Sequence, residues 1–313
     1  MKRLLILAAA AIALLAGCSQ YKYETVAGDP METKMYTLDN GLKVYMTVNK
    51  ETPRIQTYIA VKVGGKNDPS ETTGLAHYFE HLMFKGTEQF GTADYAAEKP
   101  LLDQIEALFE VYRVTEDEAE RAELYRQIDS ISYLASDIFI PNEYDKLMSV
   151  IGAEGTNAYT STDMTVYVED IPSNQIENWA RIEADRFMHP VIRGFHTELE
   201  TVYEEKNMSL TNDFRKSLEA MDGILFADHP YGTQTVLGTQ EHLKNPSVTN
   251  IKNYHKTYYV PNNMAICLSG DFDPDQMLSI IEKYFGQMEP NKELPEVDFE
   301  TKTVIESPVS KEV

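Results

Sequence analysis

Two histidines and a glutamate stand within five positions in the stretch HYFEH, residues 77–81. On a helix, His77, Glu80 and His81 are related by steps of three and four residues, so their side chains share one face. Two imidazoles one turn apart can bind the same zinc ion, and a carboxylate beside them can accept a proton from water. The spacing therefore predicts a catalytic zinc site with Glu80 as its general base.

The alternative is that these side chains share a helix face without a metal. With 7 histidines in 313 residues, H-x-x-E-H arises by chance in about one or two of a hundred such chains. Two histidines on one turn beside a glutamate are also costly to bury unless a metal or hydrogen-bond partners satisfy them. We therefore favour the metal interpretation.

A third ligand is needed, because catalytic zinc usually has three protein ligands and one position for water. A predicted helix over about 197–220 offers Glu198, Glu200, Glu204 and Glu205. Spacing alone does not select one of them, and four glutamates on a helix are also typical of an exposed acidic face. A structural zinc site is the weaker alternative, since such sites usually close with four protein ligands, often cysteines.

The segments before and around the histidines predict strands and helices in alternation. MYTLDN and GLKVYMTV alternate apolar and polar residues about Asn40-Gly41, a strong hairpin signal. A third strand is expected over 54–65, followed by the helix with the histidines, with Gly86 near its end. Because no regular βαβ repeat occurs, we expect an α+β fold with helices packed on a mixed or antiparallel sheet.

Residues 93–140 are acidic and predict an antiparallel helical hairpin. Thr115 and Glu118 form a potential capping box at the start of its second helix. The charges of this segment are typical of a solvated face.

The rest of the chain adds strands and helices of the same kind. NAYTSTDMTVYVEDI predicts a strand over 157–171, and an amphipathic helix around Trp179 follows. NMAICLSG predicts a last strand, and a helix opened by Asp273 ends at Gly286. DFDPDQMLSIIE resembles a calcium loop but lacks the glycine of its sharp turn, so helix capping is the favoured interpretation.

Together these motifs resemble the pitrilysin/insulinase family of zinc metallopeptidases, inverzincins that include mitochondrial processing peptidase. The shared motifs, in the family's order, are the Asn-Gly hairpin, GLAHYFEHLMFKGT, NAYTSTDMTVY, ELETVYEEKNM, HPYG and NNMAICLSGDFDP. The resemblance implies that His77 and His81 bind one Zn²⁺ per chain and that Glu80 is the general base. It also implies that the later of two glutamates seven residues apart is the third ligand. That makes Glu205 the ligand and Glu198 a supporting catalytic carboxylate.

The resemblance also implies a place for the substrate. Asn157, Ala158 and Tyr159 would lie on an edge strand beside the zinc, where an extended peptide adds as a further strand. An ordinary half-buried strand would show the same alternation of residues. The sequence departs from the family in one spacing, since Glu205 follows His81 by about 50 residues more than is usual there. A surface insertion over 93–140 would explain the difference, and such an insertion costs little free energy.

Family members enclose their substrate between two similar halves. After the insertion is set aside, this chain has the length of one half and shows no internal repeat. The resemblance therefore implies a zinc peptidase domain over 33–292, a linker over 293–313, and a second half from another subunit or a longer chain. The implied activity is hydrolysis of peptides or unfolded segments. The alternative is a non-catalytic peptide-binding or scaffolding subunit of a two-chain peptidase.

The start of the chain predicts an export signal. Two basic residues precede 13 apolar residues from Leu4 to Ala16, a run too short to span a bilayer. The segment ends in Leu15-Ala16-Gly17-Cys18, which resembles the lipobox of bacterial lipoproteins. This implies a signal peptide over 1–17, a lipidated tether over 18–32, and a protein lipid-anchored in the bacterial cell envelope. An ordinary secretory signal is the alternative.

Charge and cysteine content narrow the partners further. The net charge of −22 opposes binding to nucleic acid or to anionic headgroups, so membrane association is expected through the lipid alone. The chain has 2 cysteines. If Cys18 is acylated, Cys267 has no partner for an intrachain disulfide, and we expect it to be a small buried apolar residue.

Overall fold

The structure is a computed structural model that describes residues 21–295, 305 and 307–312. The predicted signal segment, Cys18 and part of the predicted linker lie outside the described residues. Among the helices that are described, none combines the length and the apolar character needed to cross a bilayer.

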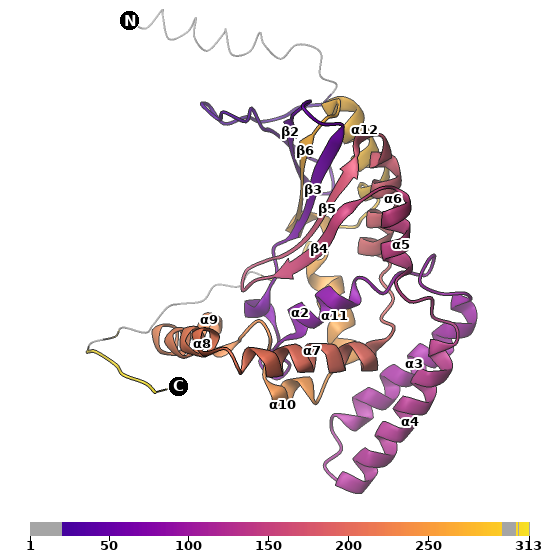
Figure 1. Cartoon of the computed structure of the whole chain (residues 1–313), viewed down its shortest axis with the longest axis vertical. Coiled ribbons are helices and arrows are strands. Elements are labelled where there is room, and N and C mark those ends of the chain that lie inside the picture. Colours follow the sequence, from indigo (N-terminus) through magenta and orange to yellow (C-terminus); the bar gives the residue numbers. More distant parts are fainter. Residues whose placement is uncertain (1–20, 296–304, 306, 313) are drawn as a thin grey trace, which may run out of the picture.

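Six strands form one mixed sheet in the order β1-β2-β6-β3-β5-β4 (Figure 1). Only β2 and β6 are parallel among the neighbouring pairs of the described sheet; the other pairs are antiparallel. This confirms the expected α+β fold with a mixed sheet. The strands are β1 (Lys34–Thr37), β2 (Lys43–Val48), β3 (Arg54–Val61), β4 (Glu154–Thr160), β5 (Thr165–Pro172) and β6 (Met264–Gly270).

The predicted hairpin at Asn40-Gly41 joins β1 to β2. Gly41 has a φ of 90°, a conformation that a side chain would strain. The Asn40 side-chain amide donates to the carbonyl oxygens of Phe285 and Met288, at 2.9 and 3.1 Å. The turn is therefore tied to the C-terminal end of the described domain, as well as to its own strands.

Three helices lie along one face of the sheet: α5 (Glu143–Val150), α6 (Ile176–Met188) and α12 (Pro274–Phe285) (Figure 1). Trp179 and Phe187 of α6 and Phe285 of α12 are fully buried. Asp273 accepts a hydrogen bond from the Gln276 backbone at 2.9 Å, which confirms it as the cap of α12.

The opposite face of the sheet is more exposed. Along β3, Ile55 and Ile59 are buried, whereas Tyr58 between them is 38% exposed. Cys267 of β6 pairs with Tyr58 and is only half-buried, so the prediction that it is a buried core residue was wrong. The reason is its register, since alternate residues of a strand point to opposite faces.

The remaining helices gather at the end of the sheet where β4 ends and extend outward from it (Figure 1). They are α2 (Leu75–Leu82), α3 (Tyr95–Tyr112), α4 (Glu118–Ser136), α7 (Phe195–Ser209), α8 (Asp213–Leu225), α9 (Pro230–Thr233), α10 (Gln240–Leu243) and α11 (Val248–Tyr258). Short 3₁₀ helices are η1 (Gly65–Asn67), η2 (Ser173–Gln175) and η3 (Pro261–Asn263).

Two predicted elements are each divided in the structure. The stretch 157–171 contains parts of β4 and β5, because the chain reverses where the Ser161 amide donates to the Met164 carbonyl oxygen at 2.8 Å. The predicted helix over 197–220 is α7 followed by α8. The break occurs where the Asn212 side chain accepts from the Arg215 amide and begins a new helix.

Two boundaries also differ from the prediction. The strand expected over 54–65 ends at Val61, because its glycine pair leads into η1. Asp117, rather than Thr115, caps α4 by accepting from the Glu120 amide at 2.9 Å. Thr115 instead donates to the Val111 carbonyl oxygen at the end of α3.

The predicted helical hairpin is α3 and α4, which pack side by side and against the rest of the domain (Figure 1). Phe109 of α3 packs edge-on against Phe195 of α7, with ring centroids 4.8 Å apart. Glu98 is completely buried and binds Arg193, so the prediction that the charges of the hairpin form a solvated face was wrong for this residue.

A buried ionic cluster lies where β5, α5 and α6 meet. Glu169, Glu183 and Arg186 are fully buried, and Arg186 pairs with both carboxylates. The Tyr144 hydroxyl lies 3.0 Å from Glu169 and 2.8 Å from Glu183. One hydroxyl has one proton to donate, so hydrogen bonds to both groups require a proton on one carboxyl. Burial, with the nearby charge of Glu183, raises the pKa of Glu169 to about 7.

This raised pKa predicts a pH dependence of stability. The folded chain keeps a proton on Glu169 that the unfolded chain releases above its ordinary pKa of 4.5. The free energy of unfolding is therefore expected to fall as pH rises from about 5 to about 7, by up to roughly 3 kcal/mol. Glu169→Gln should flatten that fall in urea unfolding of the metal-free chain.

The matched control is Glu177→Gln, at a carboxylate on the exposed surface of α6. This variant should keep the slope of the wild type between pH 5 and 7. An unchanged slope in Glu169→Gln would contradict the assignment of the proton to this carboxyl.

Candidate metal centre

Helix α2 presents the two histidines and the glutamate as the sequence predicts. It begins at Gly74, whose φ of 88° and contact with Gly238 leave no room for a side chain. The buried Asp68 carboxylate accepts from the amides of Gly74, Leu75 and Ala76, at 2.7, 3.2 and 2.9 Å. Burial raises the pKa of Asp68 to about 8, and its oxygens still satisfy three backbone amides of the first turn, so Asp68 fixes where α2 starts and how it is oriented.

His77, His81 and Glu205 converge from α2 and α7. The Nε2 atoms of the two histidines are 3.2 Å apart, and Glu205 Oε2 lies 3.5 Å from His77 Nε2 and 3.7 Å from His81 Nε2. Ligands at zinc's usual bond length in a tetrahedral site are about 3.3 Å from one another. The three atoms therefore fit one zinc ion, with the His₂Glu donor set of several catalytic sites.

Glu198 orients one of these histidines. Its Oε1 accepts from His81 Nδ1 at 2.7 Å, which leaves the Nε2 lone pair of His81 facing the other two donors. Its Oε2 pairs with the Lys85 ammonium. Burial alone would raise the pKa of Glu198, but the hydrogen bonds from His81 and Lys85 outweigh it and hold the pKa below its usual value.

The two histidines differ in their affinity for protons. Burial, with His81 and Arg215 nearby, lowers the pKa of His77 to about 4, so this imidazole is neutral at pH 7. Burial also lowers the pKa of His81, but the hydrogen bond and charge of Glu198 outweigh it and raise the pKa above its usual value. A metal ion must therefore compete with a proton mainly at His81.

Glu80 lies beside the three donors but is not one of them. It is 7% exposed and lines the same hollow, of about 600 Å³, as His77 and Glu205. The Thr160 hydroxyl donates to its Oε2. Burial raises the pKa of Glu80, partly offset by this hydrogen bond, and a raised pKa makes a carboxylate a better proton acceptor.

The three predicted substrate residues are also at this site. Asn157, Ala158 and Tyr159 belong to β4, which is the last strand of the described sheet and pairs only with β5 there. Ala158 lines both hollows that contain His77 and Glu80, Asn157 lines one and Tyr159 the other. The Asn157 side chain accepts from the Ala158 amide at 2.9 Å.

Several residues at the site were missed from the sequence. Asp68 and Arg215 lie outside the motifs quoted above, and Lys85 and Thr160 lie inside two of them but were given no role. Arg215 lines the hollow beside the metal-facing residues. Lys85 had a weak signal, because it is a basic residue only four positions after His81; in the structure it lies just beyond α2 and pairs with Glu198. The alternative ligand Glu204 lies away from the donors, where it accepts from the Asn207 amide side chain.

Two family models match the chain. Residues 43–101, which include α2, match insulinase (peptidase family M16), and residues 247–312 match the peptidase M16 inactive domain. Insulin-degrading enzyme of Mus musculus is 24% identical over 279 residues, or 87% of this chain and 22% of that protein. The uncharacterized zinc protease YmxG of Bacillus subtilis is 23% identical over 260 residues, or 82% of this chain and 50% of that protein.

A solved structure shares the fold. The crystal structure of a protease from Helicobacter pylori superposes with a TM-score of 0.64 and 21% identity, over 88% of this chain and 53% of that one. The chain thus spans about half, or less, of the length of the proteins it matches.

The geometry predicts which glutamate binds the metal. We expect the wild-type chain to bind one zinc ion and Glu205→Gln to lower the affinity by more than ~100-fold, beyond the loss typical of a supporting residue. Glu204→Gln, one residue away on the exposed surface, is the matched control and should bind zinc normally. Competition with a chelating dye measures both affinities; loss of zinc from Glu204→Gln alone would reverse the assignment.

A second prediction concerns pH. Zinc affinity should fall as pH drops from about 8 to about 6, because protons then occupy His81. Glu198→Gln removes the charge that raises the pKa of His81, so the fall should begin at lower pH. The same variant should lower the affinity at pH 8 by ~10–100-fold, because His81 loses its orienting partner. An onset at the same pH in both proteins would show that Glu198 does not control His81.

Proposed function

Because the chain belongs to the insulinase (M16) family of peptidases, we propose that it is a zinc-dependent endopeptidase that hydrolyses peptides or unfolded polypeptide segments. The observation that carries this proposal is the convergence of His77, His81 and Glu205 next to a buried Glu80. A purely structural site would have no need for a carboxylate that lines the hollow without binding the ion.

In this proposal, His77, His81 and Glu205 hold the zinc. When bound, the ion supplies a Lewis acid that polarises a carbonyl and increases the acidity of water. Glu80 accepts the proton of the attacking water on its carboxylate and returns it to the leaving amine. Thr160 holds that carboxylate in place through its hydroxyl. Glu198 keeps Nδ1 of His81 protonated and so keeps its Nε2 available.

The substrate is proposed to bind along β4. An edge strand has unpaired backbone groups on one side, and an extended peptide can pair with them without any particular sequence. Asn157, Ala158 and Tyr159 lie beside Glu80, so a peptide paired there passes over the metal donors. This mode of binding favours peptides and unfolded segments over folded proteins, whose backbone groups are already paired.

We further propose that the active peptidase needs a second, similar half. The chain spans about half of the H. pylori protease and of YmxG, and its metal hollow is open on one side. A second subunit or a further part of the same polypeptide would close it. The alternative, a non-catalytic peptide-binding subunit, is supported by the match of residues 247–312 to a domain described as inactive.

We also propose where the protein is located in the cell. The lipobox-like residues that end at Cys18 support a lipoprotein held in a bacterial cell envelope by its acyl groups. The strongly negative chain gives no electrostatic attraction to anionic lipid, so the acyl groups would provide the anchoring.

Glu80→Gln tests the catalytic proposal. This variant should bind zinc like the wild type but cleave peptides ~10²–10⁴-fold more slowly, because the general base is lost. Cleavage of a mixed peptide library is measured by mass spectrometry, with and without a co-expressed second half, and Glu204→Gln is the matched control. Cleavage that survives both Glu80→Gln and a chelator would eliminate the proposed mechanism.

A further inference from the structure

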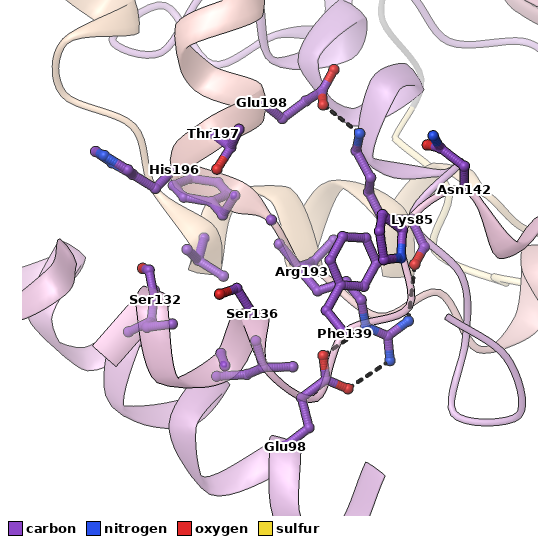
Figure 2. Close-up of a pocket in the computed structure, with 18 residues that line it drawn as sticks. Lys85, Glu98, Ser132, Ser136, Phe139, Asn142, Arg193, His196, Thr197 and Glu198 are labelled. Carbon is purple, nitrogen blue, oxygen red and sulfur yellow. Dashed lines mark hydrogen bonds and ion pairs between the residues drawn. The ribbon is translucent and has the colours of Figure 1, made fainter. Parts of the chain in front are cut away.

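A second cavity lies behind the Lys85–Glu198 ion pair, between the helical hairpin and the start of α7 (Figure 2). Its volume is about 250 Å³. Phe139 lies beside Arg193, and Ser132 and Ser136 of α4 lie at one side (Figure 2). Most of the wall is apolar, with contributions from Leu102, Ile105, Ala135, Phe139, Ile192 and Phe195.

The strongly charged groups at this cavity are already paired with one another. Arg193 donates from Nε and Nη2 to the two carboxylate oxygens of Glu98, at 2.9 Å each. Lys85 pairs with Glu198 at the opposite side (Figure 2). A charged ligand would have to break one of these pairs or enter without a partner, and both are costly in an apolar environment. The wall therefore favours an uncharged, apolar ligand.

The size of the cavity matches a large side chain. An apolar protein cavity of about 150 Å³ is enough to bind benzene. This cavity is larger, so it has room for an aromatic ring or a long aliphatic chain. Ser132 and Ser136 give it a polar rim on α4, where a ligand would meet solvent.

The cavity adjoins the metal centre. Lys85, Asn142 and Glu198 line it, and the same residues also line the hollow that contains His77, Glu80 and Ala158. Glu198 is in direct contact with His81, through the 2.7 Å hydrogen bond to Nδ1. A peptide that follows β4 past the metal donors therefore passes the three residues that line both spaces.

We propose that the cavity is a specificity subsite that receives a large uncharged side chain of the bound peptide, an inference that rests on the proposed peptidase function. The helical hairpin provides one wall, so the hairpin selects substrates. Discrimination between side chains comes from apolar burial. A phenylalanine side chain is transferred from water into the cavity, whereas an alanine side chain is too small to fill it.

Peptide binding tests the subsite without requiring cleavage. Full-length Glu80→Gln protein is titrated with short alanine–serine peptides in which one phenylalanine is moved from position to position. We expect one position to bind ~10–100-fold more tightly than the peptide without phenylalanine. An aspartate at that position should bind no better than alanine. Equal affinity for every peptide would overturn the proposal.

Substitutions at the rim test whether the preference for phenylalanine arises in this cavity. Ser132→Phe and Ser136→Phe, each combined with Glu80→Gln, should fill the cavity and abolish the preference for phenylalanine. The matched control is Ser130→Phe on the same helix, at an exposed residue that does not line the cavity. Thermal unfolding establishes that each variant folds. A preference that persists in both rim variants would overturn the proposal.

Binding of free indole is measured as well, so that failure of the subsite can be told apart from failure of the proposed peptidase function. If indole binds but no phenylalanine position is preferred, the cavity is a small-molecule site and the peptide subsite is overturned. If neither indole nor any peptide binds, the subsite is overturned as well. If zinc and cleavage are absent but the phenylalanine preference remains and is lost in the rim variants, the peptidase proposal fails and the peptide subsite stands.

Discussion

The contact between α2 and α7 is the interaction on which the candidate site depends. Each helix alone has only part of the donor set, and their residues are far apart in the chain. The Tyr78 hydroxyl donates to the Phe195 carbonyl oxygen, and His81 Nδ1 bonds to Glu198, so the two helices are joined at two points along their length. With these points fixed, Glu205 two turns further along α7 comes within 3.7 Å of both Nε2 atoms. A shift of α7 by one residue would rotate Glu205 away from them.

Buried polar and charged groups hold the supports of these helices in one arrangement. Asp68 fixes the start of α2, Arg193 ties the chain after α2 to Glu98, and Arg186 is enclosed by aromatic rings that include Phe84. Each of these groups would be destabilising without its partners, because a buried polar or charged group left unpaired loses its hydration without compensation. Alternative packings of α2 are therefore disfavoured. The site needs this support, because the positions of the three donor atoms must be held to within about half an ångström.

The sequence predicted contacts between residues that are close together in the chain, and missed contacts between residues that are far apart in it. His77, Glu80 and His81 are one helical turn apart, so helical geometry alone placed them together. Glu205 could not be separated from Glu204 by spacing, because adjacent residues point about 100° apart on a helix and only the position of α2 decides which faces the metal. Asp68 and Thr160 reach α2 through tertiary contacts, for which the sequence has no local signal. The division of the 157–171 strand at Ser161 was missed because the whole stretch has residues that favour strands.

The helical hairpin lies apart from the metal donors and beside the proposed subsite. It enters the chain between α2 and α7, the two helices of the metal centre, yet none of its residues lines the hollow at His77, Glu80 and Glu205. It packs instead on the start of α7, where Phe109 contacts Phe195, and leaves a cavity beside Glu198. The donors are carried by α2 and α7, and the hairpin supports these helices through Glu98 and Phe109, so changes in the hairpin that preserve these two contacts are expected to leave the metal geometry intact. The hairpin provides one wall of this cavity, so under the proposal above the selectivity of the cavity can vary while the metal donors stay in place.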